Sequence, residues 1–242
     1  QWNALKLLNE KGEFISAEDG ATVLKIAESE SFDFAGVTEL GQYVYNDTYL
    51  KKHIDKIVKH KWVDAKAIAK AKFKIAVDGV NSSGGFAVPA LLKALGVKKI
   101  VSLYAEPNGK FAHNPEPLPE NIRAICKTVK TEKCDLGIVV DPDVDRLAFI
   151  QEDGKPFGEE YTLVAVADYL LKKKKGNTVS NLSSTRALRD VTDKNGGLYA
   201  AAAVGEVNVV TKMKATNAII GGEGNGGVIF PDLHYGRDAL VG

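Results

Sequence analysis

Short apolar runs alternate along this chain with amphipathic stretches of about 10 to 20 residues. This alternation is typical of strands joined by helical crossovers, and such crossovers place successive strands parallel in one sheet. The sequence therefore predicts an α/β fold, with tandem three-layer α/β domains and mixed, mostly parallel sheets. The predicted strands are Leu5–Asn9, Lys74–Asp78, Lys99–Tyr104, Leu136–Asp141, Leu147–Gln151, Thr178–Asn181, Leu198–Ala202 and Ala218–Gly221.

Apolar residues recur at helical spacing between these strands. Ser16 and Asp47 are predicted N-caps, and Gly96 is a predicted stop after a helix. The predicted helices are Ala17–Ser29, Asp47–Lys70, Phe86–Leu95, Pro119–Lys130, Gly158–Lys173, Thr185–Lys194 and Gly205–Met213.

Length and two polar breaks predict the domain organisation. A chain of 242 residues holds one large domain or two compact ones. One break is the polar stretch 38–47, and the other is the turn Glu152-Asp153-Gly154-Lys155-Pro156. Each following segment of about 100 residues repeats the same order of strands and helices, which predicts a structural repeat.

Charge and hydropathy exclude several classes of protein. Lys and Arg total 32 against 31 for Asp and Glu, so no overall positive field favours nucleic acid or an anionic membrane. The longest apolar runs are shorter than a membrane span, and we expect a cytoplasmic protein without a nucleic-acid or membrane partner.

Cys126 and Cys134 lack the spacing of a metal site and are expected to be buried thiols. The start at Gln1, without an initiator Met, suggests a fragment.

The loop Asp141-Pro142-Asp143-Val144-Asp145-Arg146 lies between two apolar runs and is the sharpest chemical motif. Alternating carboxylates in an extended loop offer three hard oxygen ligands to one divalent ion, such as Mg²⁺ or Ca²⁺. Two other interpretations stay open. Asp141, Asp143 and Asp145 with Glu152 match the acidic positions of a calcium-binding EF-hand, although Arg146 replaces its glycine, and the loop also fits a solvated acidic turn.

Arg146 directly follows the three aspartates. A guanidinium beside a metal site offers paired donors to a phosphate, so Arg146 is a candidate catalytic residue. A salt bridge to the neighbouring aspartates is the alternative.

A second motif, residues 221–227, combines five glycines with Glu223 and Asn225. Glycines allow a ligand to approach the backbone closely, and the carboxylate and amide are suited to adjacent sugar hydroxyls. Gly222, Glu223, Gly224 and Asn225 are therefore candidate substrate-binding residues, with a simple glycine-rich turn as the alternative.

Two further loops carry polar groups. Residues 78–85 link a strand to a helix, and we interpret Ser82 and Ser83 as part of the loop that starts the helix rather than as nucleophiles. His113 lies in a proline-rich loop that fits either a rigid turn or a ligand-binding loop.

The Asp-x-Asp-x-Asp-Arg loop at 141–146 and the Gly-Glu-x-Asn-Gly-Gly loop at 222–227 together resemble those of the α-D-phosphohexomutases. Their order and separation of about 80 residues also agree with this family. The resemblance implies that residues 1–45 are the end of domain 1, 46–153 domain 2 with the metal-binding loop, and 154–242 domain 3 with the sugar-recognition loop. It also implies that domain 4 and the phosphoserine loop are absent from the sequence.

The same resemblance implies reversible transfer of a phosphoryl group between a serine and a hexose phosphate, through a hexose bisphosphate intermediate. Mg²⁺ is then the cofactor and is bound by Asp141, Asp143 and Asp145. Arg146 assists the phosphoryl group, and Glu223 contacts sugar hydroxyls. Asn225 stands where many members have Ser, and this variant is most similar to the phosphoglucosamine mutase and archaeal-type phosphomannomutase branches. A non-catalytic, Mg²⁺-dependent sugar-phosphate-binding relative is the alternative function.

Overall fold

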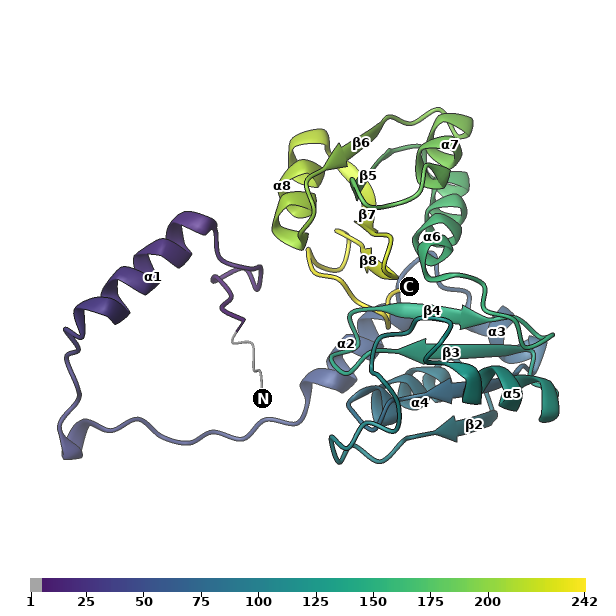
Figure 1. Cartoon of the computed structure of the whole chain (residues 1–242), viewed down its shortest axis with the longest axis horizontal. Coiled ribbons are helices and arrows are strands. Elements are labelled where there is room, and N and C mark those ends of the chain that lie inside the picture. The colour runs from purple at the N-terminus through teal and green to yellow at the C-terminus, as the bar shows by residue number, and fades with distance from the viewer. Residues whose placement is uncertain (1–5) are drawn as a thin grey trace. The chain divides into compact units, whose positions relative to one another are not determined.

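The computed structural model describes residues 6–242, which divide between residues 49 and 50 into two compact units (Figure 1). The first unit contains helix α1 (Ala17–Ser29) and a short 3₁₀ helix, η1 (Val37–Glu39). Ser16 caps α1 as predicted, because its hydroxyl accepts a hydrogen bond from the Asp19 amide while the Asp19 side chain accepts from the Ser16 amide. None of the described helices is both long and apolar enough to cross a membrane.

Helix α2 (Tyr49–Val58) starts at the last residue of the first unit and otherwise belongs to the second unit. The second unit continues through α3 (Ala65–Ala71) into a four-stranded sheet of order β2-β1-β3-β4. Strand β1 pairs in parallel with β2 and β3, and β4 runs antiparallel to β3. The strands are β1 (Lys74–Asp78), β2 (Lys99–Leu103), β3 (Leu136–Val140) and β4 (Leu147–Ile150), with helices α4 (Gly84–Ala94) and α5 (Arg123–Thr131) between them.

A second sheet, of order β6-β5-β7-β8, repeats this topology. Its strand β5 is parallel to β6 and β7, and β8 is antiparallel to β7, so the predicted structural repeat is present. The strands are β5 (Asn177–Asn181), β6 (Tyr199–Ala202), β7 (Ala218–Glu223) and β8 (Gly227–Ile229), and the helices are α6 (Glu159–Lys173), α7 (Ala187–Lys194) and α8 (Glu206–Thr216).

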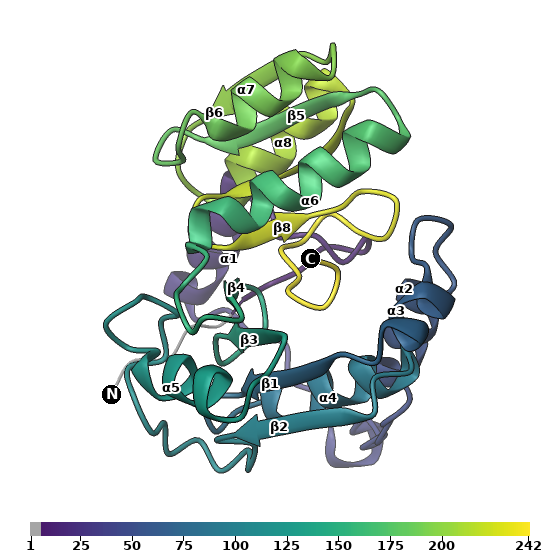
Figure 2. The same ribbon diagram turned by 90° about the vertical axis from the view of Figure 1, so that its right-hand side faces the viewer.

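Helices cover both faces of each sheet, which confirms the tandem three-layer α/β class (Figures 1 and 2). Successive side chains of β1 alternate between the faces, as the strand period requires. Ile75 and Val77 pack with Val88 and Leu92 of α4, whereas Ala76 lies in the core on the α5 side. In the second sheet, α6 and α7 pack on one core and α8 on the other, through buried residues that include Leu163, Leu188, Ile220, Val209 and Met213.

Several predicted boundaries differ from the structure. Asp47–Lys70 is not one helix, because the chain turns after α2 and Asp64 caps a new helix by accepting from the Ala67 amide. The predicted strand Leu5–Asn9 is wrong from residue 6 onward, where only a bridge between Leu8 and Phe14 forms, and its first residue lies outside the described residues. Strand β8 was not predicted.

The topology places the polar loops together. The carboxyl ends of neighbouring parallel strands meet at one edge of a sheet. The loops after β1 and β3 therefore leave the first sheet side by side, and β7 ends at Glu223 in the second sheet. After β8, the C-terminal segment passes back toward the first sheet (Figure 2). Ala239 of this segment packs in the core with Val88.

Candidate functional site

The aspartate loop connects β3 to β4 and gathers three carboxylates. Asp141 is buried, Asp145 is half-buried and Asp143 is exposed, and one potential ligand oxygen from each lies within 4.8 Å of the others. Strands flank this loop and Glu152 is exposed in the turn after β4, so the helix-flanked EF-hand interpretation is wrong. The donor set fits a divalent ion that prefers oxygen ligands.

The backbone of the aspartate loop is held by hydrogen bonds within the loop and by hydrogen bonds from the loop that precedes α4. The amides of Asp145 and Arg146 both donate to Oδ1 of Asp141 at 3.0 Å. The hydroxyls of Ser82 and Ser83 donate to the Pro142 carbonyl at 2.8 and 2.6 Å. The two serines thus lie in the loop before α4, as predicted, and they also hold the aspartate loop in place.

The charges of the loop favour a cation. Burial, together with the nearby charge of Asp145, raises the pKa of Asp141 to about 7. Ionised carboxylates packed this closely repel one another, and a bound divalent cation removes that repulsion. The residues present therefore fit a metal site.

Arg146 projects its donors beside the carboxylates. Its Nη1 atom donates to Glu116 at 3.2 Å, and its Nε atom lies 3.7 Å from Asp141 and 3.8 Å from Asp145, within ion-pair range. Among the described residues, this Nε atom is buried and makes no hydrogen bond. A buried donor without an acceptor is costly, which favours an anionic ligand at this position.

Glu223 ends β7 and is buried. It accepts hydrogen bonds from Asn181 and Arg237, both at 2.9 Å. Asn225 lies in the following turn, and its amide nitrogen is 3.5 Å from the same carboxylate. Part of the predicted glycine-rich loop is therefore strand, since β7 continues through Gly221 and Gly222 to Glu223.

Gly222 and Gly224 have packing roles that sequence reasoning did not identify. A Cβ atom at Gly222 would collide with the backbone carbonyl of Gly227 across the hairpin. At Gly224 it would lie 3.1 Å from the Cα of Ser184. These glycines permit close approach of neighbouring backbone, whereas their predicted contact with substrate remains a prediction.

The structure brings the aspartate loop and the Glu223 hairpin together. Arg146 forms an isolated antiparallel bridge with Gly227, and the Leu147 amide donates to the Gly226 carbonyl at 3.0 Å. The two predicted motifs therefore belong to one continuous polar region.

Arg237 is the main residue that sequence reasoning missed. Only 12% of its side chain is exposed, and it donates to Asp145 at 2.6 Å, Glu223 at 2.9 Å and Glu206 at 2.9 Å. Burial opposes the positive charge, but the three carboxylates hold the pKa of Arg237 above its usual value. No local pattern marks this residue, because its partner Asp145 lies 92 positions earlier.

The loop with His113 is tied to this region. Nε2 of His113 lies 3.1 Å from the buried carboxylate of Asp78, and its ring packs edge-on against Tyr104. Burial raises the pKa of Asp78, although the hydrogen bond from the Val80 amide opposes this. Glu116 of the same loop reaches Arg146, so the loop contributes to the arrangement of the site.

A second group of potential metal ligands, His53, His234 and Asp238, is better explained as a hydrogen-bonded cluster. Nδ1 of His234 accepts from the Gly236 amide at 3.1 Å, which places the proton of a neutral ring on Nε2. Nε2 then donates to Asp238 at 2.8 Å and has no lone pair for a metal. The cluster connects α2 to the C-terminal segment.

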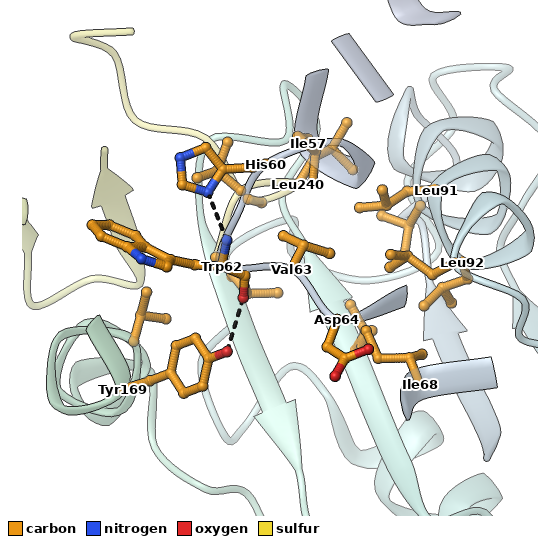
Figure 3. A pocket seen from close by; sticks show the side chains of 18 of the residues that line it. Ile57, His60, Trp62, Val63, Asp64, Ile68, Leu91, Leu92, Tyr169 and Leu240 are labelled. Carbon is orange, nitrogen blue, oxygen red and sulfur yellow. Dashed lines mark hydrogen bonds between the residues drawn. The ribbon is translucent and has the colours of Figure 1, made fainter. Parts of the chain in front are cut away.

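A cavity of about 620 Å³ lies elsewhere in the second unit, with walls that include Ile57, Leu91 and Leu240 (Figure 3). The Tyr169 hydroxyl near its wall donates to the Trp62 carbonyl at 2.8 Å. The walls are mainly apolar, so this cavity does not suit a sugar phosphate.

Comparison with known proteins gives one consistent family. The model described as phosphoglucomutase/phosphomannomutase, alpha/beta/alpha domain II, matches residues 51–154, and that for alpha/beta/alpha domain III matches residues 158–242. A phosphoglucomutase/phosphomannomutase of Thermococcus kodakarensis is 37% identical, over 100% of this chain and 52% of the relative. A probable phosphoglucosamine mutase of Methanopyrus kandleri is 30% identical, over 98% of this chain and 52% of the relative.

A solved phosphoglucomutase/phosphomannomutase family protein of Burkholderia thailandensis superimposes with a TM-score of 0.77 at 26% identity, covering 94% of this chain and 48% of that protein. The chain spans about half the length of the curated relatives it matches. The matched domains, the relatives and the fold agree, and the chain belongs to the α-D-phosphohexomutase family.

Proposed function

We propose that this chain carries the metal-binding and sugar-binding parts of a phosphohexomutase. Such an enzyme interconverts a hexose 1-phosphate and a hexose 6-phosphate through a phosphoserine and a hexose bisphosphate. The observation that carries the proposal is the contact between the aspartate loop and the Glu223 hairpin, through the bridge of Arg146 to Gly227. This contact supports the proposal because it brings the three aspartates, Arg146 and the Glu223 hairpin into one region.

Each group has a proposed role. Asp141, Asp143 and Asp145 hold Mg²⁺, which when bound offsets negative charge on the transferring phosphoryl group. Arg146 donates from its guanidinium to phosphoryl oxygens, as electrostatic catalysis of phosphoryl transfer requires. The Glu223 carboxylate accepts hydrogen bonds from sugar hydroxyls, and the side-chain amide of Asn225 donates to them. Gly222 and Gly224 keep the hairpin backbone close to the sugar.

The domain assignment belongs to the same proposal: residues 1–45 to the end of domain 1, 46–153 to domain 2 and 154–242 to domain 3. The reacting serine and the general acid and base are not assigned to residues of this chain. Phosphorylated glucose, mannose and glucosamine are the candidate substrates, and the proposed location is the cytoplasm.

A coupled assay on the longest gene product that carries this chain tests the activity. It supplies each candidate hexose 1-phosphate with Mg²⁺ and a hexose bisphosphate primer, and we expect turnover of at least one of them. Binding of the bisphosphate without turnover of any hexose phosphate contradicts the mutase and supports a non-catalytic sugar-phosphate-binding relative.

A further inference from the structure

Arg237 joins three segments that are far apart in the sequence. Asp145 lies in the loop between β3 and β4, Glu206 starts α8, and Glu223 ends β7. Each of the three guanidinium nitrogens donates to a different one of these carboxylates. One side chain therefore contacts both the proposed metal loop and the proposed sugar-binding hairpin.

The charge balance around Arg237 depends on what binds nearby. The side chains of Asp145, Glu206 and Glu223 are 15%, 10% and 6% exposed, so solvent screens their charges only weakly. A single guanidinium neutralises three carboxylates incompletely. A divalent cation bound at the aspartate loop would attract Asp145 and would weaken the interaction of Asp145 with Arg237.

Glu223 is directly affected by that change. Nη1 of Arg237 donates to one oxygen of Glu223, while Asn181 donates to the other. If a cation shared Asp145, Arg237 would interact more strongly with Glu223 and would fix the carboxylate that is proposed to contact the sugar. The planar fork of the guanidinium makes this geometry specific, because a lysine ammonium cannot reproduce three donors fixed in one plane.

We propose that Arg237 is a positioning residue that couples cation binding at Asp141, Asp143 and Asp145 to hexose-phosphate binding at Glu223. The inference rests on the proposed function of these two groups. Glu206 helps to hold Arg237 in position. Its carboxylate accepts hydrogen bonds from Nε of Arg237 at 2.9 Å and from the Arg237 amide at 3.3 Å. The coupling acts in both directions, since each ligand changes the affinity for the other by the same factor.

The test is a calorimetric titration of Mg²⁺ into the full-length gene product, done without and with saturating glucose 1,6-bisphosphate. The two titrations are compared at equal concentrations of free Mg²⁺. In the wild-type protein we expect the bisphosphate to tighten Mg²⁺ binding by about fivefold or more. In Arg237→Gln this ratio falls to about one, and in Arg237→Lys it is intermediate. Arg186→Gln, which removes only a solvent-exposed partner of Asp190, keeps the wild-type ratio.

Glu206→Gln keeps the test decisive if Arg237→Gln does not fold. Glu206 is not proposed to contact Mg²⁺ or the bisphosphate, and Glu206→Gln removes one ion pair of Arg237. We therefore expect the ratio of Mg²⁺ affinities with and without bisphosphate to fall while Mg²⁺ still binds. An unchanged ratio in folded Arg237→Gln or in Glu206→Gln overturns the inference, as does a wild-type protein that binds both ligands independently. A wild-type protein that binds neither ligand overturns the proposed function instead.

Discussion

Nε2 of His53 lies 2.6 Å from Oδ2 of Asp238, and this contact joins α2 to the segment that follows β8. Asp238 also accepts from His234 and, through its other oxygen, from the Leu240 amide at 2.8 Å. The hydrogen bond to Asp238 raises the pKa of His53, although burial opposes it. Burial disfavours the charged Asp238, but the two histidines hold the pKa of this carboxyl below its usual value.

These two shifts predict a limited pH window for the stabilising contact. The contribution of Asp238 is present above the ordinary carboxyl range of about pH 4, whereas that of His53 is complete below about pH 6.5 and is lost as the pH rises through its raised pKa. We therefore expect His53→Gln to lower the free energy of unfolding by about 1–2 kcal/mol between these limits and by less at pH 8.

Urea unfolding at pH 4.5, 6 and 8 measures this difference. Lys59→Gln, an exposed change directly after α2, serves as the control and is expected to show no such window. A destabilisation by His53→Gln that is equal at all three pH values would show that the charged contact is not its source.

Asp143→Asn tests the aspartate loop. Asp143 is exposed, so the substitution is expected to leave the fold intact while weakening Mg²⁺ binding by about tenfold or more, since one charged ligand is lost. Calorimetric titration with Mg²⁺ gives the affinity. Glu152→Gln is the matched control, and we expect unchanged affinity because Glu152 lies in the turn after β4; a reversal of these two results contradicts the assignment.

Glu223→Ala is expected to weaken hexose bisphosphate binding by about tenfold or more, with a smaller effect on Mg²⁺ affinity, because of these two ligands only the bisphosphate is proposed to contact this side chain. It also leaves donors of Asn181 and Arg237 without their acceptor, at a cost of about 1–3 kcal/mol in stability. Binding and thermal unfolding of the same samples separate the effects. Equal loss of both affinities would indicate a general disturbance of the site.

The paired serines predict a non-additive effect. Ser82 and Ser83 donate to the same Pro142 carbonyl, so replacing either one by Ala leaves one donor and is expected to change Mg²⁺ affinity little. The double Ala variant leaves the carbonyl without both donors and is expected to lose about 1–2 kcal/mol of stability and several-fold in Mg²⁺ affinity.

Urea unfolding and Mg²⁺ titration of the two single variants and the double variant check this expectation. Ser102→Ala, an exposed serine on β2, is the control for loss of a hydroxyl. Strictly additive changes would show that the two hydroxyls act independently of the shared carbonyl.

The local sequence pattern correctly predicted helices whose ends depend on interactions between residues close together in the sequence. Helix α1 has the predicted bounds, and Ser16 caps it through a bond to a residue three positions away. The pattern failed where one continuous periodicity covered two elements, since Asp64 starts a new helix inside the predicted stretch 47–70. It also missed β8, because Gly227 and the two residues after it acquire strand structure only by pairing with β7.

The sequence by itself determined the α/β class and the set of groups that we propose for the chemistry. The three alternating aspartates, Arg146 and Glu223 are readable because each motif is contiguous. Only the tertiary structure decided that these motifs meet, that Ser82 and Ser83 hold the aspartate loop, and that Arg237 connects Asp145 with Glu223. The physical reason is that Ser82 lies 60 positions from Pro142 and Arg237 lies 92 positions from Asp145, although only 14 from Glu223. Strand order and crossover connections, rather than local periodicity, set the separation of such distant residues in space.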